Sequence, residues 1–318
     1  MAKTREIRKR IASVRNIHKI THTMERVAQS KVVKLNTRIA AARAFRADLA
    51  RLLPEALGAA LGTSQAHEAL AAIPLTAPRA APTTGSRIML FVVTSSRGLC
   101  GAYNARVLQA TRARMQDLSR AGMVPVLAVM GKKGLSYFRY HNQPVEIAMS
   151  DSDENLPFAG LLEVFGQAAA LYTSRSVAAL ELVSTRYRTK AVQEVVIRRL
   201  LPFDFTLPAG AAAAGPATIR RGGDKSTSGA EEALYFVEPT RHDVLAALVP
   251  LAAGVELFCA VLEAMLGEQA QRSLAMRSAS DNADSMTKKL TRTYNRARQA
   301  QITSEMIEII SGSEGGRE

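Results

Sequence analysis

The residues best placed for phosphate chemistry lie at 94–104, where the chain reads Thr-Ser-Ser-Arg-Gly-Leu-Cys-Gly-Ala-Tyr-Asn. This stretch follows an apolar run and precedes a helical pattern, and glycines with backbone amides at a strand-to-helix junction can cradle a phosphate. However, its spacing matches neither GxGxxG nor GxxxxGK[ST]. The ribose of a nucleotide would need an acid about 20 residues further on, and Asp117 falls inside the predicted helix. The pattern therefore favours a structural turn over a nucleotide site.

Histidines offer a second kind of chemistry. His18 and His22 are four residues apart on one predicted helix and could share a metal ion, but no carboxylate stands beside them as a third ligand, which favours solvated or packed imidazoles. The other histidines have no Cys, Asp or Glu at metal-ligand spacing: His67, His141 and His242. The hydroxyls of Thr94, Ser95 and Ser96 have no recognisable His and Asp partners. We predict no catalytic residue, no metal site and no bound cofactor.

The two cysteines, Cys100 and Cys259, stand in glycine-rich or apolar surroundings, which is typical of buried thiols in a reducing compartment. Tryptophan is absent and aromatic residues make up 5% of the chain. This scarcity argues against a surface that stacks nucleic-acid bases.

Positive charge is concentrated at the two ends of the chain. The formal net charge is +14, and residues 1–51 hold 14 Lys and Arg against three acids, while residues 267–300 hold seven against three. The excess near the N-terminus is too one-sided for a lattice of ion pairs along a helix. A solvated surface, an acidic protein partner and a nucleic-acid backbone remain open. A basic coiled-coil protein that binds nucleic acid is therefore the alternative function.

Residues 1–55 predict one long helix, because no Pro or Gly occurs before Pro54 and apolar residues recur in steps of three and four. About 50 residues at 1.5 Å each would make a rod of roughly 75 Å, which needs a partner helix along its length. The predicted apolar stripe is Ile7, Ile11, Val14, Ile17, Ile20, Met24, Val27, Leu35, Ile39, Ala42, Phe45, Leu49 and Leu52.

A second long helix is predicted over 240–312, with a C-cap at Ser311-Gly312 and a tail at 313–318. Two long stripes at opposite chain ends indicate an antiparallel, left-handed coiled coil. The stripe of this helix is Val255, Phe258, Leu262, Met265, Gln269, Leu274, Met276, Ala279, Ala283, Met286, Leu290, Tyr294, Ala297, Ile302, Met306 and Ile309.

Between the two helices the sequence predicts an α/β fold. A linker at 56–86 leads to a central doubly wound, Rossmann-like domain at 87–238, because apolar β-branched runs alternate with helical patterns. Strands are expected at 87–94, 124–130 and 145–149, then a hairpin at 178–188 and 192–200, with helices at 102–121, 132–140 and 157–174. A low-complexity insertion at 203–230 precedes a short strand at 233–237.

We predict no membrane span, because no stretch of about 18 apolar residues is free of charge. The longest candidate, 244–266, is broken by Pro250, Glu256 and Glu263.

Three motifs follow one another over nearly the whole chain. The first is Glu6–Asn16 with Lys19–Thr21 and Met24. The central signature consists of Arg97, Gly98, Cys100, Gly101 and Asn104. The third runs from Met276 through Asp281–Ala283 and Tyr294–Ala300 to Ser311-Gly312. Together these motifs resemble the gamma family of F-type ATP synthases, and departures such as Arg26 suggest a divergent bacterial variant.

This resemblance implies the central rotor shaft that couples ion translocation through the membrane sector to ATP synthesis or hydrolysis at the catalytic beta subunits. It implies a non-catalytic subunit that is present in one copy per complex. This subunit would contact the ring of alpha and beta subunits, the epsilon subunit and the c-ring, and it would not bind nucleic acid. The complex would hold it at the cytoplasmic face of the bacterial inner membrane. The implied rotor–stator contacts are Met24, Arg272, Arg298, Gln299, Thr303 and Glu305.

Overall fold

The computed structural model describes residues 2–57, 73–76, 82–150, 156–190, 192–204, 238 and 240–314. Most of the predicted linker, nearly all of the low-complexity insertion and the predicted strand at 233–237 lie outside these residues. The chain divides into two compact units. Unit 1 comprises Met1–Val33, Leu99–Gly101 and Gln269–Glu318, and unit 2 comprises Lys34–Gly98 and Ala102–Glu268.

Two long helices occupy the two ends of the chain, as the sequence predicts. Helix α1 spans Ala2–Leu57 and helix α6 spans Arg241–Glu314. Thr240 caps α6, because the Asp243 N–H donates to Thr240 Oγ1 at 3.2 Å and that hydroxyl donates to Asp243 Oδ2 at 2.6 Å. The predicted end at Ser311-Gly312 is wrong, since α6 continues to Glu314. One glycine in a last turn costs only about 1 kcal/mol and is a weak stop signal.

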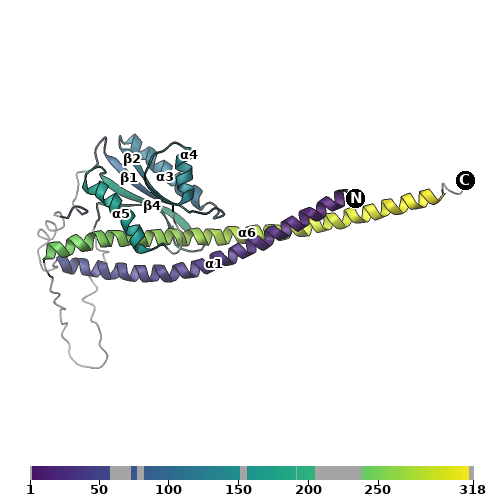
Figure 1. Ribbon diagram of the computed structural model, residues 1–318, viewed down its shortest axis with the longest axis horizontal. Coiled ribbons are helices and arrows are strands. Elements are labelled where there is room, and N and C mark those ends of the chain that lie inside the picture. Colours follow the sequence, from purple (N-terminus) through teal and green to yellow (C-terminus); the bar gives the residue numbers. More distant parts are fainter. Residues whose placement is uncertain are drawn as a thin grey trace, which may run out of the picture. The chain divides into compact units, whose positions relative to one another are not determined.

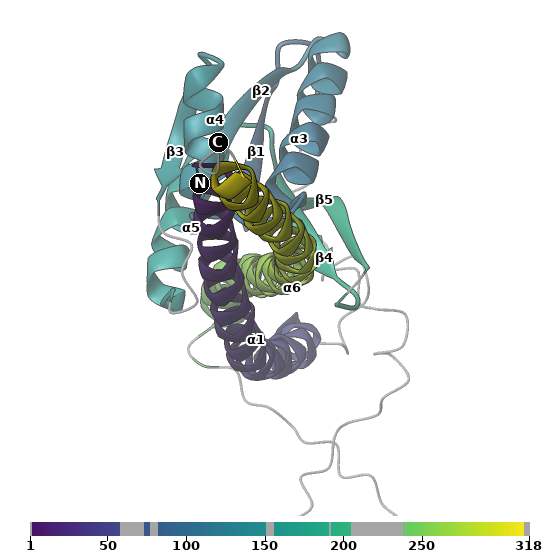
Figure 2. The same ribbon diagram turned by 90° about the vertical axis from the view of Figure 1, so that its right-hand side faces the viewer.

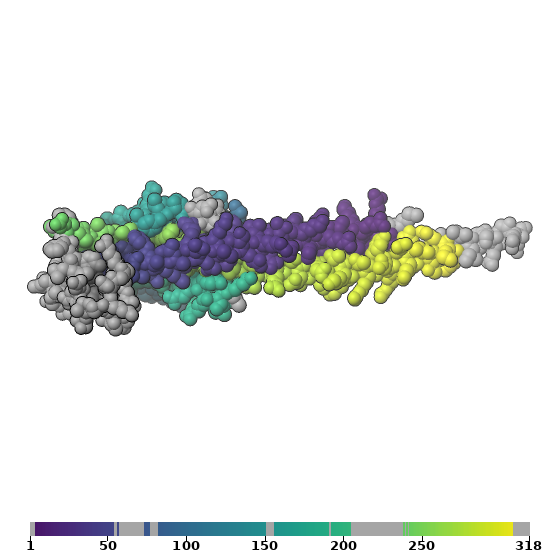
Figure 3. All heavy atoms as spheres, turned by 90° about the horizontal axis from the view of Figure 1, so that it is seen from below, coloured from purple at the N-terminus to yellow at the C-terminus, as the bar shows by residue number. Residues whose placement is uncertain are grey.

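In unit 1 the two helices lie side by side and run in opposite directions (Figure 3). Thr4 Oγ1 donates to Gln301 Oε1 at 3.1 Å. One turn later on α1, Arg8 Nη2 donates to the Tyr294 hydroxyl at 2.6 Å, and its guanidinium lies 5.5 Å from the centre of that ring. Because the residue number rises on one helix as it falls on the other, the pairing is antiparallel.

The inward-facing positions of unit 1 repeat every seven residues, and we call these two lines the seam. Alternating steps of three and four residues connect all of them, and a strict seven-residue repeat imposes a left-handed supercoil. On α1 the seam is Thr4, Ile7, Ile11, Val14, His18, Thr21, Glu25, Ala28 and Val32. On α6 it is Gln269, Ser273, Met276, Ser280, Ala283, Thr287, Leu290, Tyr294, Ala297 and Gln301.

The predicted stripe on α1 is wrong in its middle part. Ile17, Ile20 and Val27 are 49%, 60% and 50% exposed, whereas His18 and Thr21 lie in the seam. From Ile17 to Val27, each predicted stripe position lies one residue before the true seam position. The prediction chose the nearest apolar residue, whereas the seven-residue repeat selects its neighbour. Phe45 and Leu52 of α1, and Met286, Ile302 and Met306 of α6, are also exposed.

Unit 2 contains a five-stranded sheet with the strand order β3-β2-β1-β4-β5, seen across its width in Figure 2. The strands are β1 Arg87–Val93, β2 Val124–Met130, β3 Val145–Met149, β4 Ala179–Tyr187 and β5 Gln193–Leu201. The first four are parallel, and β5 returns antiparallel to β4 as the predicted hairpin. The predicted fold class, an α/β domain between long terminal helices, is confirmed.

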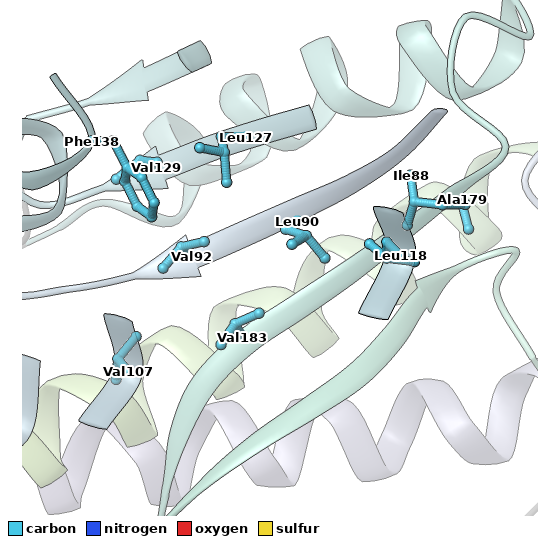
Figure 4. Packing of buried hydrophobic residues seen from close by; sticks show 10 residues of the cluster. All are labelled: Ile88, Leu90, Val92, Val107, Leu118, Leu127, Val129, Phe138, Ala179 and Val183. Atoms are coloured by element: carbon cyan, nitrogen blue, oxygen red, sulfur yellow. The ribbon is translucent and has the colours of Figure 1, made fainter. Parts of the chain in front are cut away.

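Three helices connect the parallel strands: α3 Tyr103–Arg120, α4 Lys132–Tyr140 and α5 Phe158–Thr173. The order reverses at β1, so right-handed crossovers place α3 and α4 on one face of the sheet and α5 on the other. Helices α3 and α4 pack onto the sheet through one apolar cluster (Figure 4), made of Ile88, Leu90, Val92, Val107, Leu118, Leu127, Val129, Phe138, Ala179 and Val183.

On the other face, unit 2 packs against its own parts of α1 and α6 (Figure 1). The rings of Phe158 on α5 and Phe258 on α6 meet edge to face at 5.2 Å. Glu256 on α6 accepts from Arg46 on α1 at 3.1 Å and lies 3.8 Å from Arg198 on β5. One carboxylate therefore links both helices to the sheet.

By length and composition alone, α6 could cross a membrane. However, more than half of its most apolar stretch is buried inside the chain. The core helix of a globular unit has the same properties, so this observation is weak evidence for a membrane span.

The seam predicts different costs for two matched substitutions. Ala283→Gly, in the seam, should lower the free energy of unfolding by about 2 kcal/mol, from about 1 kcal/mol of helix propensity and about 0.8 kcal/mol for a lost buried methyl group. Ala12→Gly, on the exposed side of α1, should lower the free energy of unfolding only by the helix-propensity cost of about 1 kcal/mol. Urea unfolding of the purified chain measures both, and equal losses would place Ala283 outside the seam.

Candidate functional site

The turn after β1 is locked to the end of β2. Thr94 Oγ1 donates to the Met130 carbonyl at 2.8 Å and accepts the Gly134 N–H at 3.0 Å. Gly131 has a φ of 100°, and a Cβ there would stand 2.2 Å from the Thr94 carbonyl oxygen. A glycine is therefore required at this position, and the two strand ends are held together rigidly.

Ser95 and Asn104 use their polar groups within the turn or toward α4. Asn104 Oδ1 accepts the Ser95 N–H at 3.0 Å, and Asn104 Nδ2 donates to Ser95 Oγ at 2.7 Å. Ser95 Oγ in turn donates to the Arg97 carbonyl at 2.7 Å, and the Ser95 carbonyl accepts the Lys133 N–H at 3.1 Å. This geometry favours the structural turn over the nucleotide site.

The rest of the central signature lies at the tip of the turn. Arg97 is exposed, Gly98 is half-buried and Cys100 is buried. Gly101 has a φ of 57°, and within unit 1 a Cβ at this residue would be 3.6 Å from Gln271 Oε1 on α6.

Sequence reasoning missed Leu99. It has a φ of 63° although it is not a glycine, and its side chain is 60% exposed. A left-handed leucine is uncommon, and such backbone strain gathers at functional sites. No residue type in the sequence could have signalled it, because leucine does not favour this conformation.

The two histidines of α1 lie together, with ring centres 6.0 Å apart and planes 9° apart. His22 Nε2 accepts from Arg26 Nε at 3.3 Å, so one of its nitrogens is engaged with a cation. Within the described ranges, no group of three His, Cys, Asp or Glu side chains is arranged to hold a metal ion.

Four of the six implied rotor–stator contacts lie exposed on the part of α6 that belongs to unit 1: Arg298, Gln299, Thr303 and Glu305. Arg298 and Glu305 are seven residues apart and share one side of the helix, while Gln299 and Thr303 are four apart on another. Gln301 Nε2 donates to Glu305 Oε1 at 2.8 Å and orients that carboxylate.

The other two residues are less accessible. Met24 on α1 is half-buried. Arg272 on α6 is 6% exposed, which leaves its guanidinium little surface for another subunit. Nothing in the residue type signals this burial, because lysine and arginine are almost always at the surface.

The outer surface of unit 1 is strongly basic. Its exposed cations on α1 are Arg5, Arg8, Lys9, Arg10, Arg15, Lys19 and Arg26. Those on α6 are Arg277, Lys288, Lys289, Arg292, Arg296 and Arg298. Few acids oppose them: the Glu6 carboxylate lies 2.7 Å from Arg10, and Asp284 lies 2.7 Å from Lys288. This surface fits a partner with acidic groups.

Comparisons with known proteins identify the family. The model of the family described as ATP synthase matches residues 3–315. The ATP synthase gamma chain of Gemmatimonas aurantiaca is 32% identical over 313 residues, which is 98% of each chain. This chain belongs to the ATP synthase gamma family. Another gamma chain, from Mycolicibacterium smegmatis, is 34% identical over 326 residues, 98% of this chain and 97% of that one.

Two solved structures have a similar fold. A chain of the Euglena gracilis mitochondrial ATP synthase rotor matches with a TM-score of 0.60 and 18% identity, over 95% of this chain and 99% of that one. A chain of the OSCP/F1/c-ring assembly from the same organism matches with a TM-score of 0.64 and 20% identity, over 99% and 94%. At sequence identities of 18% and 20%, this similarity shows that the folds are alike.

Both cysteines are free thiols and both are buried, which confirms their predicted environment. Burial raises the pKa of the Cys259 thiol to about 11, an effect that the nearby Arg46 guanidinium partly opposes. Because a thiolate is the reactive form, Cys259 should be inert to thiol reagents in the folded chain at neutral pH.

This raised pKa predicts a loss of stability in alkali. In the unfolded chain the Cys259 thiol ionises near its ordinary pKa, while in the folded chain it stays protonated until about pH 11. The contribution of Cys259 is therefore complete below about pH 8.5 and declines up to about pH 11. Urea unfolding of the natural chain and of Cys259→Ala, compared across this range, isolates the effect. Parallel pH profiles would contradict it.

Proposed function

We propose that this chain is the central rotor shaft of an F-type ATP synthase. It couples ion translocation through the membrane sector to ATP synthesis or hydrolysis at the catalytic beta subunits. The observation that carries the proposal is the mixed pattern of unit 1, in which polar residues interrupt an otherwise apolar seam while several apolar residues and most of the cations face outward.

A coiled coil built to stand in water would keep its seam apolar and its outer face polar throughout. Here His18, Thr21 and Glu25 occupy consecutive seam positions, while Ile17 and Ile20 are exposed. Covering an exposed aliphatic side chain completely stabilises a complex by about 1.5–3 kcal/mol. The outer face of unit 1 is therefore suited to enclosure by other subunits.

The partners follow from family membership and from charge. We propose that the alpha and beta subunits form a ring around unit 1, and that acidic loops of the beta subunits meet its cations. The epsilon subunit and the c-ring would be further contacts, and each complex would contain one copy of this chain. One matched Euglena assembly comprises OSCP, F1 and the c-ring, which supports this arrangement.

The chain itself would supply no catalytic group. The polar side chains of the turn at 94–104 hydrogen-bond to one another or to nearby backbone, which supports a structural role. Nucleotide and its chemistry would belong to the partners. Membrane association would come through the complex, at the cytoplasmic face of the bacterial inner membrane.

Rotor–stator contact would be made by Arg298, Gln299, Thr303 and Glu305, with Met24 on the facing helix. Arg298 offers planar, bidentate donors to carboxylates, and Glu305 offers an oriented acceptor. Since Arg272 is 6% exposed, we assign it a role inside this chain in place of the contact that the resemblance implies.

Purification from native membranes tests the function. A tagged chain should co-purify with alpha and beta subunits, and a monomer recovered alone would contradict the proposal. A nucleic-acid-binding protein would instead bind DNA with an affinity that falls steeply with salt, by several units in a log–log plot. None of the comparisons supports that alternative.

The contact assignment predicts a matched pair of variants. Arg298→Ala should lower ATP synthesis by the assembled complex about tenfold, the loss expected for one charge-assisted hydrogen bond of about 1.5 kcal/mol. Arg292→Ala removes an exposed charge from the same helix and should change the rate little. Rates of ATP synthesis in reconstituted vesicles measure both effects. Equal losses for the two variants would mean that Arg298 contributes only to the net positive charge of the helix and makes no specific contact.

A further inference from the structure

The outer surface of unit 2 carries a group of aromatic and basic side chains where α4 lies beside α3. We call Arg112, Lys133, Tyr137, Tyr140 and His141 the α4 patch. The last four follow one another along α4 and its C-cap in steps of three and four residues, so they share one side of the helix. Arg112 Nη1 on α3 donates to the Tyr137 hydroxyl at 3.4 Å, which joins the second helix to the patch.

The aromatic rings of the α4 patch contact one another. The ring centres of Tyr137 and His141 are 4.5 Å apart, and those of Tyr140 and His141 are 5.3 Å apart. Tyr137 also meets Phe138 edge to face at 5.4 Å, and Phe138 belongs to the buried core cluster. The patch is therefore already ordered, so that a partner binding there would restrict few side-chain motions.

The α4 patch also leaves aromatic surface in water. Tyr140 is 83% exposed. Single exposed apolar side chains are common on protein surfaces, but this ring lies with two others in a chain that has only seven tyrosines. Tyrosine and arginine supply much of the binding energy of protein interfaces, because each combines a large contact area with polar groups. The patch thus has the composition of the centre of an interface.

The polar groups of the α4 patch are donors and cations. The Tyr137 hydroxyl accepts from Arg112, and its own O–H can still donate to another group. Asp117, the acid of α3, lies on another side of that helix, 3.6 Å from Arg120. Among the described residues, no carboxylate forms an ion pair with Arg112 or Lys133. The patch therefore lacks acceptors with negative charge.

We propose that the α4 patch is a docking surface for an acidic segment of another subunit of the complex. Carboxylates of that segment would meet Arg112 and the Tyr137 hydroxyl, while Tyr140 packs against its apolar side chains. Charge complementarity selects such a partner. This proposal rests on the proposed function, because it places the chain in a complex of several subunits.

The number of cations favours a protein over the other anionic partners. The α4 patch has two permanent cations, Arg112 and Lys133. Nucleic-acid binding depends on many phosphate contacts, and an anionic lipid surface is bound by clusters of about 4–8 Lys and Arg. Two cations among three rings match neither of these.

A photoreactive side chain tests the proposal in the assembled complex. p-Benzoylphenylalanine in place of Tyr140 keeps an aromatic group at this position. On illumination of the purified complex, it should cross-link the tagged chain to one segment of another subunit, which mass spectrometry identifies and which should be rich in Asp and Glu.

The outcomes separate this proposal from the rotor function. If alpha and beta subunits co-purify but no cross-link forms, the docking surface is overturned and the rotor function stands. Capture of lipid, nucleic acid or a segment without acids also overturns the docking surface. If the natural chain does not co-purify with alpha and beta subunits, both proposals are overturned.

Matched charge variants test the acidic character of the partner. In the probe-bearing chain, Arg112→Glu should lower the cross-link yield about fivefold or more, because like charges would then face each other. Arg106→Glu is the control, since Arg106 is an exposed cation on another side of α3 and should leave the yield nearly unchanged. Exchanging the cross-linked acid for lysine in the partner should restore the yield with Arg112→Glu. Equal losses for the two arginine variants, or no restoration, would overturn the proposal.

Discussion

The antiparallel pairing of the two ends of the chain is the interaction on which the rest of the structure depends. A 56-residue helix has far more apolar surface than a small sheet can cover, and long helices gain their stability from packing against a partner. In unit 1 the contacts of Thr4 with Gln301 and of Arg8 with Tyr294 mark the direction and register of this pairing. In unit 2, the ion pair between Arg46 and Glu256 also joins α1 to α6.

The pairing does not rest on a strongly apolar seam. Gln269, Ser273, Ser280 and Thr287 occupy α6 positions where a stable coiled coil would place leucine or isoleucine. Small and polar seam residues bring two helix backbones close but bury little apolar area. Ile17, Ile20 and Val27, which could have filled the seam, face outward instead, so the stability of unit 1 and its association with partners are linked.

Most element positions could be predicted from the sequence because local signals agree there. The strands at 124–130 and 145–149 and the helix at 132–140 lie as predicted, because short apolar or patterned stretches there are separated by turn residues. The central signature also pointed to a rigid turn. Its role as a hydrogen-bonded lock depends on Asn104 reaching Ser95, a contact over nine residues that spacing alone does not reveal.

The seam register could not be predicted for a physical reason. Ile17 and His18 are neighbours, and apolarity alone assigns the isoleucine to the interior, although the seven-residue repeat from Ile7 and Ile11 requires His18 there. The burial of Arg272 was equally hidden, since it depends on what other parts of the chain place around that side chain.

The strict repeat limits how the two helices can change in length. One inserted residue turns everything beyond it by about 100° around the helix axis, which would carry His18 and its successors out of the interface. Seven inserted residues restore the phase, but the opposite helix must then gain the same number to keep each pair matched. Insertions and deletions should therefore be tolerated in the connections between elements, whereas within paired stretches they should come as whole heptads in both helices.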